Sequence, residues 1–378
     1  MEASSVRTSR GAELALAARQ PVIAGVDAMR ALAIVMVLGF HLFGVLSGSL
    51  GVMIFFVLSG FLITSVLLKD IRRTGTISFK NFYSRRALRI FPNFYAAWLL
   101  EFLVFHLNHA TVLKWQAAAA FFYVSNYARA LLPLHAQGSF FMSISWSLAL
   151  EEQFYLLWPA ALLLTMRYRK HAARIVAGMI ALIWIWRFVG MEWLGVGWAY
   201  AYNAFEMRAD ALLAGALLAI LLYAGDAPEW MSLATAKKWL ALLPLLFFAA
   251  VTYVELKPVL MPVGVQLISL SLQPLVAACA LVQWIYWGSR GWRFLEHPII
   301  KWVARLSYSY YLYHLSIRNL IQIHVHVPHT QRLVGTIAVI VLPVIPYYLI
   351  ERPFMKLRDR GRKPSPLLDD GLHHAAAG

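Results

Sequence analysis

The sequence of 378 residues has few charged residues and a single cysteine, Cys279. Charged residues make up 14% of the chain, whereas soluble globular domains carry roughly 25%. This scarcity excludes an ordinary soluble domain, and the 61% share of hydrophobic residues favours a chain that lies in lipid. One cysteine cannot form an internal disulfide, so it says little about the redox compartment.

Several sequence motifs that carry chemistry in other proteins are missing as well. We find no glycine-rich phosphate loop, no cysteine pair and no His-Glu-x-x-His zinc motif. A nucleophilic-serine elbow is also absent. A metal site built from His324 and His326 is a weaker interpretation than placement of both at a membrane interface, so we expect no metal.

The net charge of +16 is the next feature that needs an explanation. In a soluble protein it would suggest a nucleic-acid partner. In a membrane protein, Lys and Arg collect in the cytoplasmic loops. We therefore expect the lipid bilayer, and not nucleic acid, to be the partner of these charges.

Long apolar runs indicate an all-α fold, a polytopic integral membrane bundle of about ten transmembrane helices. A short apolar run over 117–127 is expected to be re-entrant or interfacial. The expected spans are 28–47, 50–68, 90–108, 145–165, 174–194, 206–223, 238–255, 263–287, 303–322 and 333–350.

The distribution of positive charge predicts the orientation of these spans. With the N-terminus inside, most of the 34 Lys and Arg fall on the cytoplasmic side. Both termini are then cytoplasmic. We expect a cytoplasmic tail over 1–25 that is not a cleaved signal peptide, a membrane domain over 26–358, and a cytoplasmic, disordered tail over 359–378.

Arg30 and His41 are eleven positions apart in the first expected span. Eleven residues make about three helical turns, so both side chains face the same way, roughly 16 Å apart along the axis. Imidazole suits a general base, and an arginine at the cytoplasmic mouth suits a phosphate-bearing donor. The alternative is an Arg30 that extends to the interface and a His41 that bonds a neighbouring helix, but their shared face favours function.

Two further arginines open the third expected span. Arg86 and Arg89 are three residues apart and share a helical face, where two guanidinium groups suit a diphosphate. Ordinary positive charge on the cytoplasmic side is the alternative.

The fourth expected span contains two adjacent carboxylates, Glu151 and Glu152, beside Trp146 and Tyr155. Adjacent helical positions point about 100° apart, so we expect no catalytic dyad. A buried carboxylate needs a partner or a proton. Glu151 is expected either to orient His41 or to hold an arginine, and the spacing does not decide between these roles.

Polar residues recur in the later spans. Arg208 flanks the sixth span together with Asp210, and His314 lies one helical turn before Arg318 in the ninth. Arg208 and His314 are further site candidates, as are Trp146 and Tyr155. At the end of the last span, the adjacent Glu351 and Arg352 are expected to form a structural ion pair at the inner interface.

These residues resemble the motifs of the membrane acyltransferase-3 family, in order from about Ala24 to Arg358. One departure is Met53, where the family commonly has an aspartate after Gly-Val, so a carboxylate is missing at this position. The matching segments are the Arg30-to-His41 pair, 55–64, Arg86-Ala-Leu-Arg89, 146–155, 306–314 and Glu351-Arg-Pro-Phe354.

The resemblance implies an O-acyltransferase of the bacterial inner membrane that moves an acyl group, by default acetyl, from cytoplasmic acyl-CoA to a hydroxyl of a carbohydrate or glycolipid. It implies that His41 is catalytic, and we expect Glu151, which occupies an acidic motif position, to be catalytic as well. It assigns the CoA phosphates to Arg30, Arg86 and Arg89. Some members append an esterase-like domain; we expect the membrane part or a partner to handle the acceptor here.

A proton-coupled transporter or glycolipid flippase is the rival hypothesis, because polar residues within spans suit a transport path equally well. The absence of a visible internal repeat and the one-sided arginine cluster count against it. Acceptor identity, oligomeric state, and the choice between direct transfer and an acyl-histidine intermediate are not predicted by the sequence.

Overall fold

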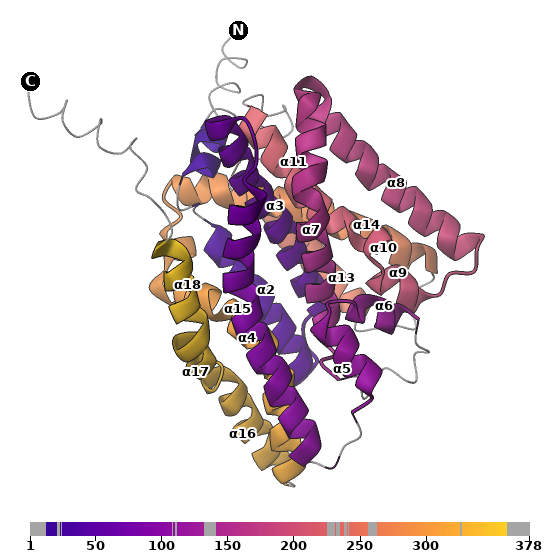
Figure 1. The fold of residues 1–378 in the computed structure, drawn as a ribbon, viewed down its shortest axis with the longest axis vertical. Helices are drawn as coiled ribbons and strands as arrows, with labels where there is room; N and C mark the ends of the chain where they lie inside the picture. Colours follow the sequence, from indigo (N-terminus) through magenta and orange to yellow (C-terminus); the bar gives the residue numbers. More distant parts are fainter. Residues whose placement is uncertain are drawn as a thin grey trace, which may run out of the picture.

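The computed structural model describes residues 13–20, 23, 25–107, 109, 112–131, 141–224, 231, 235–237, 240, 242–255, 263–325 and 327–360. Every regular element within these ranges is helical, so the predicted all-α fold is confirmed. Most of the long helices run side by side along the length of the molecule (Figure 1). The predicted tails over 1–25 and 359–378 lie mostly outside the described residues, and the division into domains stays a prediction.

The long helices follow the expected spans in order. They are α2 (Val26–Phe43), α3 (Gly48–Thr74), α4 (Phe79–Leu107), α7 (Ser145–Arg167), α8 (Ala172–Glu192), α11 (Asp210–Ala224), α13 (Leu242–Glu255), α14 (Val263–Ser289), α15 (Pro298–His324) and α16 (Pro328–Val341). After α16 the chain continues through α17 (Val344–Pro346), the π-helical η6 (Tyr347–Glu351) and α18 (Arg352–Arg360).

Six helical stretches of the described residues are long and apolar enough to cross a membrane, which makes this a multi-pass membrane protein. The expected number of ten spans and the orientation of the termini stay predictions. Two shorter helices, α11 and α13, are also apolar. The six stretches are Val26–Phe43, Gly48–Thr74, Phe79–Leu107, Arg169–Glu192, Gly264–Ser289 and His329–Arg358.

Short helices lie beside the long ones, on the right-hand side of Figure 1. The run over 117–127 is divided between α5 (Lys114–Phe121) and α6 (Ser125–Ala130), which have 8 and 6 residues. Neither is long enough to span a bilayer, in agreement with the prediction for this run. Further along, α9 (Trp198–Asn203) and α10 (Phe205–Arg208) precede α11.

The turn between α2 and α3 shows how local sequence sets the helix ends. Gly44 ends α2 in the left-handed region, with φ of 66°, where a side chain would be strained. Ser47 then caps α3, because its Oγ accepts a hydrogen bond from the Leu50 N–H at 3.0 Å. This short connection brings the end of α2, which carries His41, close to the start of α3.

Helix α3 lies at the centre of the bundle and packs most closely against α11 and α2. At Gly60, an added Cβ would stand 1.8 Å from the carbonyl oxygen of Leu212. At Gly215, it would stand 1.9 Å from the carbonyl oxygen of Val57. The two backbones therefore touch, as they do where small residues line membrane-helix interfaces.

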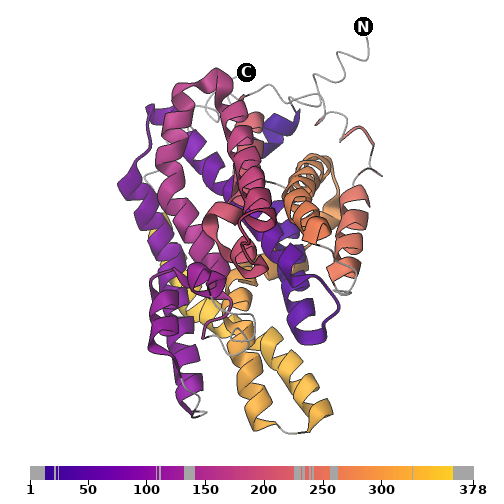
Figure 2. The same cartoon turned by 90° about the vertical axis from the view of Figure 1, so that its right-hand side faces the viewer.

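The outer helices present apolar side chains to the surroundings. Helix α8 exposes Leu182, Ile185 and Phe188, each by at least half of its surface. Figure 2 shows α15 and α16, in gold, as an antiparallel pair at the lower end of the molecule. The polar residues of α15 point instead toward α2 and α4, where the site lies.

Candidate active site

Two cavities inside the bundle contain most of the predicted site residues. One, here called the arginine cavity, is lined by Arg30, Arg86 and Arg89. The other, here called the histidine cavity, is lined by His41. Val52 and Tyr311 line both, so the two cavities meet at these residues.

The arginine cavity is built from five helices, and α3 contributes an apolar wall and Ser59. Arg30 comes from α2, Arg86 and Arg89 from α4, Glu151 from α7, and Ser307 from α15. Arg30 Nη2 donates a hydrogen bond to Ser307 Oγ at 3.1 Å. The structure therefore brings together the three arginines that the sequence assigned to one ligand.

Glu151 faces the arginine cavity, whereas Glu152 lines neither of the two cavities. Ser59 Oγ donates to Glu151 Oε1 at 2.6 Å. The Arg86 guanidinium lies 3.7 Å from the ring centroid of Tyr155, one turn after Glu151, in a cation–π contact. The sequence left open whether Glu151 orients His41 or holds an arginine, and in the structure Glu151 lies beside Arg86 in the arginine cavity. Its catalytic role stays a prediction.

His41 lies in the histidine cavity with one ring nitrogen already bonded. Its Nδ1 is 2.8 Å from the carbonyl oxygen of Val37. A carbonyl can only accept, so Nδ1 carries the hydrogen and Nε2 of the neutral ring carries the lone pair. The backbone of α2 thereby selects the tautomer that leaves Nε2 available as a base.

His314 packs against His41, a contact that neither motif reveals alone. Their ring centroids are 4.9 Å apart with an interplanar angle of 62°. His314 Nδ1 lies 2.8 Å from the Tyr311 carbonyl oxygen and 3.1 Å from that of Tyr310, so it too is the donor nitrogen. His314 is 1% exposed, and its Nε2 has no hydrogen-bond partner among the described residues.

Tyr311 forms the partition between the cavities. Its hydroxyl is hydrogen-bonded to Ser147 and lies 3.2 Å from the Ile144 carbonyl oxygen. Its ring makes an edge contact with Phe55 at 6.3 Å between centroids. A group that passes from one cavity to the other must pass beside this side chain.

Two charged residues of the histidine cavity were missed from the sequence. Glu101 of α4 is 4% exposed, and it lies in an expected span, where the cost of burying a carboxylate was a usable signal. Arg129 of α6 donates from Nη1 to the Ser143 carbonyl oxygen at 2.9 Å. Arg129 lies on a short helix between two expected spans, where no sequence signal marks it.

Comparisons with known proteins identify the family of this chain. A family model described as an acyltransferase domain matches residues 23–352. The chain belongs to the membrane acyltransferase-3 family. No solved structure matches it.

Three curated relatives illustrate the similarity. Peptidoglycan O-acetyltransferase OatA of Listeria monocytogenes is 35% identical over 53% of this chain and 34% of its own length. "Putative peptidoglycan O-acetyltransferase YrhL" of Bacillus subtilis is 32% identical over 77% of this chain and 48% of its own. "Putative O-acetyltransferase SACOL0978" of Staphylococcus aureus is 28% identical over 88% and 57%. The chain spans about half the length of the curated relatives it matches.

The remaining site candidates of this acyltransferase domain separate into lining and supporting residues. Tyr155 lines the arginine cavity, and Trp146 lines the histidine cavity beside Tyr202, with 5.1 Å between ring centroids. Arg208 is fully buried and lies over the Tyr202 ring at 4.9 Å, but it lines neither cavity. We conclude that Arg208 supports the wall of the histidine cavity from behind.

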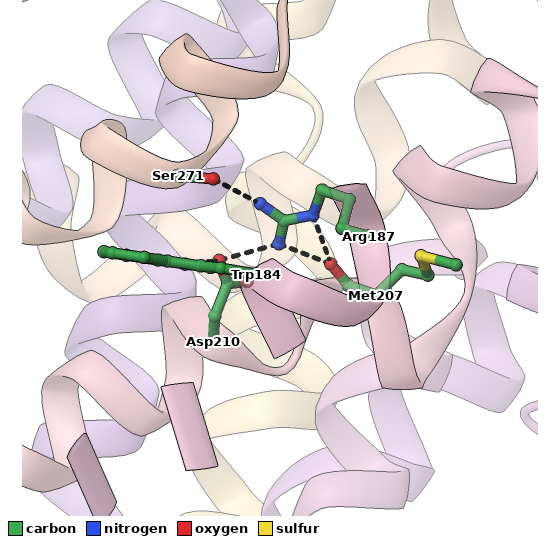
Figure 3. A network of polar contacts seen from close by, with 5 residues as sticks. All are labelled: Trp184, Arg187, Met207, Asp210 and Ser271. Carbon is green, nitrogen blue, oxygen red and sulfur yellow. Dashed lines mark hydrogen bonds and ion pairs between the residues drawn. The ribbon is translucent and has the colours of Figure 1, made fainter. Parts of the chain in front are cut away.

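Asp210 belongs to a separate buried cluster (Figure 3). Arg187 Nη2 lies 2.7 Å from Asp210 Oδ2, and both side chains are at most 1% exposed. Arg187 also bonds the Met207 carbonyl oxygen and Ser271, and Trp184 donates to Asp210. These bonds join α8, α10, α11 and α14, so the cluster holds helices together and does not face either cavity.

The predicted ion pair between Glu351 and Arg352 is wrong. Glu351 accepts hydrogen bonds from Ser309 at 2.6 Å and Asn93 at 3.2 Å. Arg352 lies over the ring of Tyr348 at 5.4 Å. Neighbouring helical positions diverge by about 100°, so one side chain faces the interior and the other faces outward.

The described residues contain no group of three His, Cys, Asp or Glu side chains that could hold a metal ion. His324 Nδ1 lies 2.9 Å from the Leu320 carbonyl oxygen, in an exposed position at the end of α15. His326 lies outside the part of the chain that the structure describes.

Proposed function

We propose that this chain is a membrane O-acetyltransferase of the bacterial cytoplasmic membrane, which moves an acetyl group from cytoplasmic acetyl-CoA to a hydroxyl of a cell-envelope glycan. The observation that carries the proposal is the meeting of two unlike cavities at Val52 and Tyr311. One offers three guanidinium groups, and the other offers an imidazole with a free lone pair.

The donor suits the arginine cavity. Arginine binds phosphate oxygens through paired, charge-assisted hydrogen bonds, and a diphosphate offers several of them. Among the described residues that line this cavity, Glu151 is the only carboxylate. In this proposal the CoA diphosphate binds Arg30, Arg86 and Arg89, and the thioester arm extends to the partition at Tyr311.

The acceptor suits the histidine cavity. Trp146 and Tyr202 offer aromatic faces on which a sugar ring can stack, close to His41. The relatives named above are peptidoglycan O-acetyltransferases or O-acetyltransferases without a stated acceptor. Peptidoglycan or another envelope glycan is therefore the acceptor class that we propose.

The chemistry needs one base and no further reactant. His41 Nε2 takes the proton of the acceptor hydroxyl while its oxygen attacks the thioester carbonyl carbon. The new C–O bond forms, the C–S bond breaks, and the leaving CoA thiolate takes the proton back from His41. An acyl-histidine route would instead form an N-acetyl bond at Nε2 first.

His314 acts in this proposal as a positioning residue. Its ring fills the space beside His41 and its Nδ1 is fixed by α15 backbone carbonyls, so it holds the His41 ring in one orientation. We expect His314→Asn to lower kcat more than it raises the KM for acetyl-CoA, since the donor phosphates bind elsewhere.

The test is CoA release from acetyl-CoA by purified, detergent-solubilised protein supplied with cell-envelope glycans. We expect release by the wild type and by His324→Ala, and a loss of at least a hundredfold in His41→Ala, given the usual contribution of a general base. Equal release by His41→Ala and wild type would overturn the role of His41. Absence of both acetyl-CoA binding and release would favour the transporter hypothesis.

A further inference from the structure

The histidine cavity is continuous with a second hollow that the proposed chemistry does not use. Arg318 and Gln322 of α15 line both, and Arg332 of α16 lines the second hollow. The α15–α16 pair that forms this hollow lies at the lower end of the molecule in Figures 1 and 2. An acceptor that enters from this end passes these side chains before it reaches His41.

Three guanidinium groups from three different helices surround this route. Arg318 is one helical turn after His314, so it lies within about 6 Å along the axis from the residue that packs on His41. Arg129 lines the histidine cavity from α6, and Arg332 is exposed on α16. Neither Arg318 nor Arg332 forms an ion pair with any carboxylate of the described residues.

Negative charge along the same route is small. Among the described residues lining the histidine cavity, Glu101 is the only carboxylate, and it is 4% exposed. None of the described residues lining the second hollow is acidic. A guanidinium group within a membrane protein is costly without an anionic partner, so the half-buried Arg318 points to a negative charge on the molecule that enters.

We infer that the acceptor carries a carboxylate or phosphate close to the hydroxyl that is acetylated, and that Arg318 binds this anion. The inference rests on the proposed function and narrows its acceptor class to anionic glycans. With the anion on Arg318, the neighbouring sugar lies between α15 and the Trp146–Tyr202 wall, and its hydroxyl faces His41. Arg129 and Arg332 add attraction at the two ends of the route.

The anion has two chemical sources, which a set of three probes distinguishes. The first probe is an oligosaccharide of alternating N-acetylglucosamine and glucuronic acid. The second is the same oligosaccharide after its carboxyl groups have been reduced to alcohols. The third is N-acetylglucosamine linked through phosphate to a long-chain alcohol, compared with the same sugar on that alcohol without the phosphate.

Acetyl transfer to each probe is measured with full-length protein in detergent, for wild type, Arg318→Gln, Arg318→Lys and Arg332→Gln. Lys114→Gln is the matched control, because Lys114, the first residue of α5, is also basic but lines a different hollow. Size-exclusion profiles and thermal unfolding establish that each variant is folded. Arg332 is exposed, so its replacement leaves packing intact.

We expect the anionic probe to be acetylated with a KM at least tenfold lower than its neutral counterpart, as a charge-assisted hydrogen bond provides. Arg318→Gln should remove this preference, Arg318→Lys should keep part of it, and the KM for acetyl-CoA should stay within about twofold of wild type. Arg332→Gln should weaken the preference mainly at low salt.

A preference for the uronic-acid probe places the anion on the sugar, and a preference for the phosphate-linked probe places it on a lipid carrier; either outcome supports the inference. Equal use of charged and neutral probes, or a preference that Arg318→Gln leaves unchanged, would overturn it while leaving the acetyltransferase intact. No CoA release with any probe or with crude envelope glycans would instead overturn the proposed function.

Discussion

The molecule buries arginine side chains in two contrasting ways. In the cluster around Arg187, all three guanidinium nitrogens donate to the protein itself, to a backbone carbonyl, a hydroxyl and the Asp210 carboxylate (Figure 3). In the arginine cavity, Arg30, Arg86 and Arg89 share one lining carboxylate, and Arg86 Nε has no hydrogen-bond partner among the described residues.

The comparison qualifies the rule that an ionisable residue within a membrane span marks a functional site. The cost of burying Arg187 is offset by its hydrogen bonds and its ion pair with Asp210. All of these partners belong to the protein, and Arg187 lines neither the arginine cavity nor the histidine cavity. Arg30, Arg86 and Arg89 form no ion pair among the described residues, and they line a space that a ligand can enter. Access to a cavity, and not burial alone, separates them from the structural pair of Arg187 and Asp210.

The largest expected effect is a loss of folding stability when Arg187 is replaced. Arg187→Met leaves the Asp210 carboxylate buried without its cation, which should cost about 3–5 kcal/mol of unfolding free energy. The double variant Arg187→Met/Asp210→Leu should lose much less unfolding free energy, because it removes both buried charges. Thermal unfolding in detergent, followed by the loss of folded protein on size exclusion, measures both; equal losses would show that the ion pair is not the cause.

Substitutions in the arginine cavity should weaken the binding of acetyl-CoA and leave the stability of the protein unchanged. Arg89→Gln should raise the KM for acetyl-CoA by about tenfold to a hundredfold, the value of a charged hydrogen bond to phosphate. Its unfolding temperature should stay close to that of wild type. Arg73→Gln is the control, since Arg73 is exposed on α3 outside the cavity. A drop in stability with an unchanged KM would place Arg89 in the same class as Arg187.

A smaller effect is expected at Ser59, which donates to Glu151 at 2.6 Å. Ser59→Ala removes one hydrogen bond that orients the carboxylate beside Arg86, so kcat/KM should fall by about fivefold, near 1 kcal/mol. Ser59→Thr retains the hydroxyl and should retain most of the activity. Ser84→Ala, at an exposed position on α4, serves as the control, and a change of equal size there would contradict the assignment.

The smallest effect is expected for the surface ion pair between Arg290 and Glu13, in which both side chains are nearly half exposed. Arg290→Gln should change the unfolding free energy by at most about 1 kcal/mol, less in high salt. Glu13 raises the pKa of Arg290, so the part of this contribution that depends on the charge of Arg290 is present at neutral pH and is lost as the pH rises into the strongly alkaline range. Thermal unfolding at neutral pH in low and high salt measures it; a loss as large as that of Arg187→Met would contradict the contrast between buried and exposed pairs.

The positions of residues on one helix, relative to one another, were predictable from the sequence. Arg30 and His41 lie on α2, and the helical period alone placed them on one face; both now line the connected cavities. The same holds for Arg86 and Arg89 on α4. The spans themselves followed from apolar runs, since a helix that crosses lipid must be apolar over its length.

Contacts between helices were not predictable in the same way. The packing of His314 on His41 depends on how α15 crosses α2, and the choice of Arg86 over His41 as the neighbour of Glu151 depends on how α7 meets α3 and α4. The Glu351–Arg352 prediction failed because adjacency in sequence was read as contact in space.

The sequence by itself determined that this is a helical membrane protein of the acyltransferase-3 family, and which polar residues share a face along each helix. Only the tertiary structure decided that these residues form two joined cavities, that Glu101 and Arg129 belong to the second, and that Asp210 belongs to neither. The reason is physical: helical periodicity is local, whereas the relative rotation and crossing of helices are set by packing, such as the backbone contact at Gly60 and Gly215.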